Sequence, residues 1–97
     1  MENQIREWKE SWRDEHLQWI CGFANSQGGV LEIGRNDKGE VIDLIDAARL
    51  LEILPNKIRN ATGVLADVDI RNENGKQYIA ITVKPYPAPV TCRTYWC

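Results

Sequence analysis

The sequence predicts an α+β fold in which two helices pack on a small, largely antiparallel sheet, in the order β-α-β-β-α-β-β. Two stretches, around residues 17–24 and 47–58, carry apolar residues at helical spacing. Short runs at 30–34, 64–70 and 79–83 are rich in apolar residues and bounded by turn-forming residues, which is typical of strands. The chain has 97 residues, enough for one domain and not for two. We therefore expect residues 1–97 to form a single domain, the N-terminal part of a longer protein.

The first two expected elements are a short strand and a helix. Residues 4–10 form the strand, with Ile5 facing inward, although the composition of this segment also suits a helix. Asp14 is the expected N-cap of the helix. The residues at i, i+3, i+4 and i+7 give this helix one apolar face: Leu17, Ile20, Cys21 and Ala24. The segment Asn25–Gly29 ends the helix, because glycine and asparagine tolerate left-handed backbone.

The middle of the chain is expected to form a hairpin and then a second helix. Val30–Gly34 is the first strand, Asn36–Gly39 the turn and Val41–Ile45 the returning strand. The second helix carries an apolar stripe: Ala47, Leu50, Leu51, Leu54 and Ile58. Pro55 is expected to kink this helix or to begin a new turn, and Gly63 is expected to end it.

Two strands joined by a turn are expected to complete the sheet. Residues 64–70 place four apolar side chains on one face: Val64, Ala66, Val68 and Ile70. Asn72–Gly75 forms the turn. The last strand is marked by Ile79, Ile81 and Val83, and the prolines at 85, 87 and 89 end regular pairing.

Composition limits the possible partners. Twelve basic and fourteen acidic residues give a net charge of −2, which argues against a grip on DNA by the whole domain but permits a local basic face. The one histidine and three cysteines show no zinc-ligand spacing. No apolar run approaches the roughly 20 residues that span a membrane, and the first residues do not resemble a signal peptide. We expect a cytoplasmic protein without a membrane partner.

Several motifs, taken together, resemble the Schlafen AlbA-like domain family. They are Glu7-Trp8-Lys9, Cys21–Asn25, Gly28-Gly29, Ile33-Gly34, Asp37-Lys38-Gly39 and Ile58-Arg59-Asn60. The resemblance covers nearly the whole chain, with departures from the family pattern at Trp8, Gly22, Arg35 and Asp43. It implies a DNA-binding domain of a bacterial transcriptional regulator, with DNA rather than RNA as its partner and with homodimers as a possible assembly.

Two sets of residues are candidates for nucleic-acid binding. The basic set is Lys9, Arg35, Lys38 and Arg59, and the turn set is Asn25, Gly28 and Gly29. Basic side chains contact phosphates, and the bare backbone of the two glycines would let a phosphate approach closely. The alternatives are that the basic residues form a solvated surface and that the glycines only stop the helix and form a tight turn.

Three carboxylates, Glu2, Glu7 and Asp37, form the remaining candidate site. In RNA-cleaving Schlafen proteins, carboxylates in matching motif positions form a metal-dependent nuclease site, which here would require Mg²⁺ or Mn²⁺. The alternative is three solvated acids, with Asp37 bonding to its own turn. The nuclease is our second hypothesis, after a binding module that needs no cofactor. The third is a non-catalytic oligomerisation module that uses the sheet edge or the four tryptophans.

Overall fold

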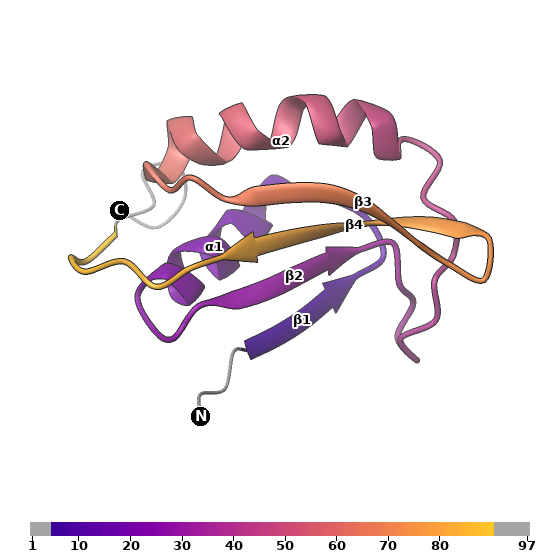
Figure 1. Cartoon of the computed structure of the whole chain (residues 1–97), viewed down its shortest axis with the longest axis horizontal. Helices are drawn as coiled ribbons and strands as arrows, with labels where there is room; N and C mark the ends of the chain where they lie inside the picture. Colours follow the sequence, from indigo (N-terminus) through magenta and orange to yellow (C-terminus); the bar gives the residue numbers. More distant parts are fainter. Residues whose placement is uncertain (1–4, 91–97) are drawn as a thin grey trace.

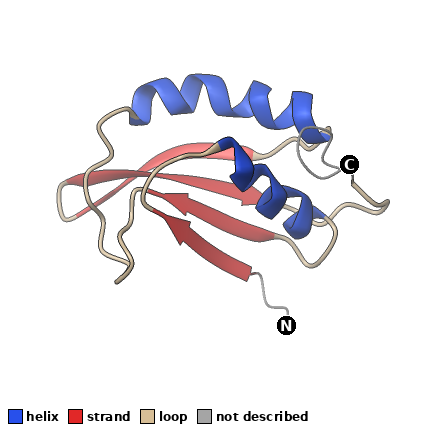
Figure 2. Ribbon diagram, turned by 180° about the vertical axis from the view of Figure 1, so that it is seen from behind, coloured by secondary structure: helices blue, strands red, loops and turns tan. Residues whose placement is uncertain are grey.

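The computed structural model describes residues 5–90, which form four strands, two α-helices and one short 3₁₀ turn. In chain order the elements are β1 (Ile5–Lys9), a 3₁₀ turn (Asp14–His16), α1 (Leu17–Ala24), β2 (Gly29–Ile33), α2 (Ala47–Thr62), β3 (Asp67–Glu73) and β4 (Lys76–Val83). Both helices lie on the same side of the sheet, and neither of them covers the opposite face (Figures 1 and 2). The predicted α+β class, with two helices on a small sheet, is confirmed.

The sheet is mixed, with strand order β1-β2-β4-β3. β1 pairs with β2 in parallel, so that Ile5 lies opposite Gly29 and Lys9 opposite Ile33. The other two pairs, β2 with β4 and β3 with β4, are antiparallel. The parallel pair follows from α1, which carries the chain back across the sheet before β2 begins. As a result, β1 and β3 are the two edge strands.

The core lies between the sheet and the helices. All four residues of the predicted α1 stripe are buried, as are four of the five predicted for α2; Leu51 is the exception. Helix α2 runs through Pro55 without a break and ends at Gly63, whose φ of +79° is the left-handed C-cap that the sequence predicts. No helix among residues 5–90 combines the length and apolar character needed to cross a membrane.

The predicted returning strand, Val41–Ile45, is reduced to one isolated bridge between Arg35 and Val41. Asp43 adopts a φ of +62°, which no strand residue can keep. Its side chain instead accepts a hydrogen bond from the Gln77 N–H at 2.9 Å, and Leu44 donates to the Gln77 carbonyl at 2.8 Å. The segment is therefore a loop tied to the start of β4, and the expectation of a strand was wrong.

Two smaller expectations about the first elements need correction. Ile5 lies on the helix-side face of β1, as expected, but at the start of this edge strand it is 45 % exposed rather than buried. Asp14 is not the N-cap of α1: it begins the preceding 3₁₀ turn, and His16 holds the N-cap position of α1. The Asp14 carboxylate instead accepts a hydrogen bond from the Trp12 indole at 2.8 Å and pairs with Lys57 of α2 at 3.2 Å. These contacts, led by the indole bond, lower the pKa of Asp14.

Candidate functional site

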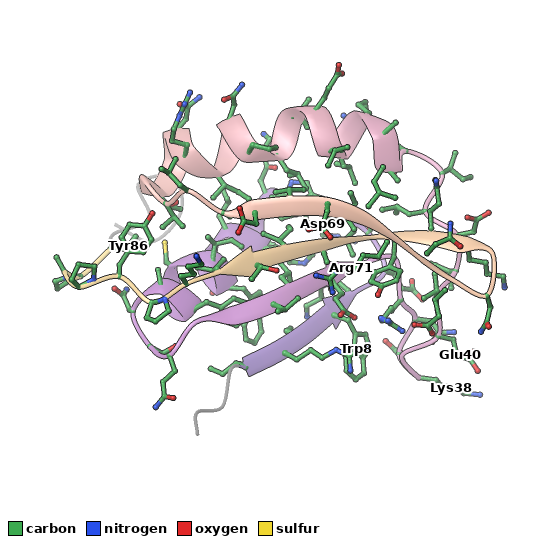
Figure 3. All side chains as sticks on the ribbon, viewed as in Figure 1. Trp8, Lys38, Glu40, Asp69, Arg71 and Tyr86 are labelled. Carbon is green, nitrogen blue, oxygen red and sulfur yellow. The ribbon has the colours of Figure 1, made fainter. Side chains whose placement is uncertain are left out.

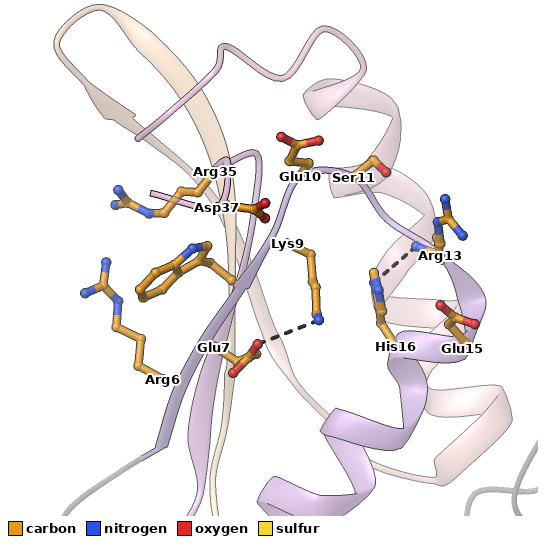
Figure 4. A pocket seen from close by; sticks show the side chains of 11 residues that line it. Arg6, Glu7, Lys9, Glu10, Ser11, Arg13, Glu15, His16, Arg35 and Asp37 are labelled. Carbon is orange, nitrogen blue, oxygen red and sulfur yellow. Dashed lines mark hydrogen bonds and ion pairs between the residues drawn. The ribbon is translucent and has the colours of Figure 1, made fainter. Parts of the chain in front are cut away.

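A pocket of about 580 Å³ opens where β1 leaves the sheet (Figure 4). It is bounded by β1, by the turn that leads into α1 and by the loop after β2. Four of its lining residues are cationic: Arg6, Lys9, Arg13 and Arg35. Four others are acidic: Glu7, Glu10, Glu15 and Asp37. The pocket is therefore polar, and the formal charges of its lining residues balance.

The alternation of β1 sends its side chains to both faces of the sheet. Glu7 and Lys9 lie on the helix side, where the Lys9 ammonium lies 3.7 Å from the Glu7 carboxylate and 5.7 Å from the centre of the Trp19 ring. Arg6 and Trp8 lie on the open side, with the Arg6 guanidinium 5.4 Å above the Trp8 ring. Figure 4 shows Arg6 and Arg35 on one side of the β1 ribbon and Lys9 on the other. The edge strand thus presents cations on both of its faces.

His16 forms the inner wall of the pocket and is almost fully buried. Its Nδ1 accepts a hydrogen bond from the Arg13 backbone N–H at 3.2 Å, and its ring meets Trp12 edge-on at 5.8 Å. Burial, assisted by the nearby Lys9 ammonium, lowers the pKa of His16. The imidazole is therefore neutral at pH 7. The sequence alone does not single out His16 as a site residue, because a single histidine beside a helix carries no pattern of its own.

Arg35 is buried and its guanidinium is fully engaged. It donates to the Glu32 carboxylate, to the Gly39 carbonyl at 2.6 Å and to Glu73 at 2.9 Å, and it lies 4.5 Å above the Tyr78 ring. The hydrogen bonds to Glu73 and, to a smaller extent, to Glu32 raise the pKa of Arg35 above its usual range. Arg35 thus joins the loop after β2 to the β3–β4 hairpin.

Two of the three predicted carboxylates, Glu7 and Asp37, line this pocket. The third, Glu2, lies outside the described residues. Across residues 5–90, no group of three His, Cys, Asp or Glu side chains is placed to hold a metal ion. The turn-bonding role expected of Asp37 belongs to Asn36, whose side-chain oxygen Oδ1 accepts from the N–H groups of Lys38 and Glu40 at 2.9 and 3.0 Å. Asp37 and Lys38 are left exposed on this loop.

The predicted turn set lies at the opposite end of the parallel pair, where β2 begins. A Cβ on Gly28 would meet the Val83 carbonyl at 2.7 Å, and one on Gly29 would meet the Ile5 carbonyl at 2.6 Å. Asn25 uses both atoms of its amide on the backbone of Val90, at 2.9 and 2.7 Å. All three residues pack the helix–strand turn against neighbouring chain segments, and both glycines are buried.

The two remaining basic residues of the prediction are separated from each other. Arg59 is exposed on α2, donates to Asn56 at 3.1 Å and is not among the residues that line the pocket. Lys38 is the neighbour of pocket-lining Asp37 and stands at the tip of its loop (Figure 3). The structure therefore gathers Glu7, Lys9, Arg35 and Asp37 at one site, with Lys38 beside it. Asn25, Gly28, Gly29 and Arg59 lie elsewhere.

Comparison with known proteins gives a family and a fold. The family model described as Schlafen, AlbA_2 matches residues 2–96. The DIP2311 protein from Corynebacterium diphtheriae has a crystal structure that aligns with a TM-score of 0.75 and 22 % identity, over 94 % of this chain and 20 % of that one. The chain thus spans about a fifth of the length of that protein. No curated protein sequence matches the chain significantly.

A second solved structure is the N-terminal domain of a protein from Nitrosomonas europaea, named as related to the ATP-dependent DNA helicase RecG. It aligns with a TM-score of 0.71 and 17 % identity, over 96 % of this chain and 71 % of that one. At these identities, both structures establish a shared fold.

Proposed function

The chain belongs to the Schlafen AlbA_2 family, as its motifs predicted, and from this premise we propose that it is a nucleic-acid-binding domain that prefers DNA to RNA. Its place in a cytoplasmic bacterial transcriptional regulator is part of the same proposal. The name of the RecG-related protein from N. europaea, which shares the fold, agrees with a role near nucleic acids. Such a domain needs a surface whose side chains can contact the phosphate groups of a nucleic acid.

The cations at the end of β1 are the observation that carries this proposal. Arg6, Lys9 and Arg13 line one pocket, and Lys38 stands beside it. The Arg6 side chain is 54 % exposed and that of Lys9 is 36 % exposed, so both can exchange their intramolecular partners for phosphate oxygens. We assign the phosphate contacts to these four residues. Arg35, although it belongs to the predicted set, supports the site by holding the loop in place.

The acidic residues of the pocket set the expected strength of binding. The chain carries a net charge of −2, and four carboxylates stand among the cations. We therefore expect one copy to bind DNA weakly and with a marked dependence on salt, because the attraction comes from a few local contacts. A homodimer would present two copies of the pocket to one duplex.

A titration of a fluorescent DNA duplex, followed by anisotropy at low salt, tests the proposal. Lys9→Ala and Lys38→Ala should each weaken binding several-fold and reduce the slope of log K against log salt by about 1. Arg49→Ala is the matched control, because Arg49 is an exposed cation on α2 and does not line the pocket. Absence of binding by the native chain, or an equal loss in all three variants, would contradict the assignment.

A metal-dependent nuclease is the second candidate, favoured by the position of Glu7 and Asp37 in one pocket with neutral His16. Mg²⁺ is commonly held by one or two carboxylates together with phosphate oxygens and water, so two acids are compatible with such a site. When bound, the ion would polarise a phosphate and supply an activated water. Glu7 and Asp37 would hold it, Glu2 being outside the described residues, while Lys9 would orient the phosphate.

Incubation of labelled RNA and DNA with Mn²⁺ tests this second candidate. Cleavage should disappear with EDTA and fall at least tenfold in Glu7→Gln, because one charged ligand is lost. Glu52→Gln, which removes an exposed carboxylate on α2, should cleave as the native chain does. Cleavage that is equal in both variants would exclude Glu7 from the reaction.

A further inference from the structure

The outer edge of β1 offers unpaired backbone groups. Within residues 5–90, β1 pairs only with β2 and stands at the end of the sheet (Figure 1). The Ile5 N–H donates to the Gly28 carbonyl at 3.3 Å, and the Lys9 carbonyl accepts from the Gly34 N–H at 2.8 Å. In a parallel ladder alternate residues face the neighbouring strand, so Ile5, Glu7 and Lys9 face β2. The N–H and C=O groups of Arg6 and Trp8 therefore point away from the sheet.

We propose that a second copy of this chain pairs with this edge, β1 against β1, antiparallel and related by a two-fold axis at Trp8. Trp8 then lies opposite the partner's Trp8 as a hydrogen-bonded pair. Glu7 lies opposite the partner's Lys9, and Arg6 comes near the partner's Glu10, the residue that follows β1. The two four-stranded sheets become one sheet with no free β1 edge.

The charges of the strand select this register. In an antiparallel ladder outward-facing residues must meet outward-facing residues, which holds for a two-fold axis at any residue of β1. Only axes at Arg6, Glu7 or Trp8 pair at least three residues of each β1 strand. An axis at Glu7 sets Glu7 against itself, and an axis at Arg6 sets Arg6 against itself, both like-charge pairs that destabilise a sheet. The axis at Trp8 gives two opposite-charge Glu7–Lys9 pairs within the paired strands, brings each Arg6 near a Glu10 just beyond them, and sets two half-buried indoles together.

The side chains that would form these pairs are available. Glu7 and Lys9 are each about one-third exposed, and their own ion pair, at 3.7 Å, is long. The loss of this intramolecular ion pair on dimerisation therefore costs little free energy. The pairing also changes the pocket, which runs along β1, because the partner's strand would stand at its rim. Two copies of the pocket would then lie close to each other, on either side of the two-fold axis.

Charge reversal provides the first test, by sedimentation without nucleic acid at protein concentrations from about 1 µM to about 1 mM, since so short an interface binds weakly. The native chain should show a concentration-dependent dimer. Glu7→Lys and Lys9→Glu should each be monomeric, because each sets like charges opposite one another. The double variant Glu7→Lys with Lys9→Glu restores both pairs and should dimerise again. Glu52→Lys, on α2, is the matched control and should behave as the native chain does.

Cross-linking provides a second test that does not depend on charge. In a Cys92→Ser, Cys97→Ser background, Trp8→Cys should form an intermolecular disulfide, since hydrogen-bonded antiparallel pairs have Cα atoms about 5.5 Å apart, within the range that a disulfide spans. Ile45→Cys, at a highly exposed loop position, should not. A native chain that is monomeric at every concentration, or a dimer indifferent to the charge reversals, would overturn the proposal. Because no nucleic acid is present, this outcome is independent of whether the domain binds DNA.

Discussion

Arg35 shows how one polar residue can organise a small domain. It lies under the loop after β2 and connects that loop to Glu32 of β2 and Glu73 of β3. Glu32, which is also buried, receives a second ion pair from Arg6 at 3.0 Å. The loop that carries Asp37 and Lys38 thus rests on a network of ion pairs across the open face of the sheet.

Removal of Arg35 should therefore destabilise the fold. Arg35→Ala leaves the buried Glu32 carboxylate with only a partly exposed partner, and we expect the free energy of unfolding to fall by about 3 kcal/mol. Arg71→Ala, which removes an exposed pair with Asp69 at 2.9 Å, should cost less than about 1 kcal/mol. Urea unfolding of the two variants measures the difference. Equal losses would mean that the Arg35 network adds nothing beyond a surface ion pair.

His16 should make the stability depend on pH. Its pKa is lowered in the folded chain, so protons bind more readily to the unfolded chain. The stability that neutral His16 supports is complete above its ordinary pKa of about 6.5 and is lost as the pH falls from there toward the lowered value. Urea midpoints should therefore drop between about pH 7.5 and about pH 5.5. In His16→Asn the drop should shrink; an unchanged drop would assign it to other groups.

The sequence predicts which residues gather at the pocket better than it predicts what each of them does there. Lys9, Glu7 and Asp37 were selected and lie in one pocket. Arg35 was selected as a phosphate contact, but its burial could not be seen in the sequence, because its partners Glu32 and Glu73 come from different strands. His16 was missed, because its meaning depends on the fold that surrounds it.

At the scale of the elements, the Asn25–Gly29 turn shows why two adjacent glycines are needed. Gly28 has a φ of +85°, and its N–H closes the turn on the Phe23 carbonyl at 2.9 Å. Gly29 lies so near the Phe23 ring that a Cβ would meet it at 2.7 Å. The turn brings the end of α1 directly against the start of the parallel pair.

Two glycine substitutions should therefore have opposite effects. Gly29→Ala forces a contact with the Ile5 carbonyl and the Phe23 ring, and we expect it to cost about 2 kcal/mol or more. Gly22→Ala lies within α1, where an added Cβ meets nothing within 4 Å, and should stabilise by up to about 1 kcal/mol. Thermal unfolding of both variants decides the point. A tolerated Gly29→Ala would show that the turn has room for a side chain.

The periodic elements were the most predictable from sequence. Both helices were predicted from their apolar stripes, because a repeat every three or four residues survives in any tertiary context. The Val41–Ile45 segment has the apolar composition of a strand, but its Asp43 and Leu44 bond to Gln77, a contact across 34 positions that no local pattern encodes. The exposure of Ile5 was not foreseen for a similar reason, since the sequence does not say which strand lies at the edge.

At the scale of the whole molecule, the parallel pairing of β1 and β2 divides the predicted binding residues. Lys9 and Asp37 lie where the paired strands β1 and β2 end, whereas Asn25, Gly28 and Gly29 lie where β2 begins. The sequence predicts a largely antiparallel sheet, but it does not predict that β1 and β2 run parallel. The family motif therefore covers two separate places: a packed turn and a charged pocket.

The position of the nucleic-acid surface is the central claim, and an NMR titration of the chain with a short DNA duplex tests it most directly. Backbone amide shifts should concentrate in residues 6–13 and 36–39, around the pocket at the end of β1, and should reverse on addition of salt. The amides of Asn25–Gly29 and those around Arg59 on α2 should move little. Shifts centred on that turn or on α2, or no shifts at all, would contradict the account.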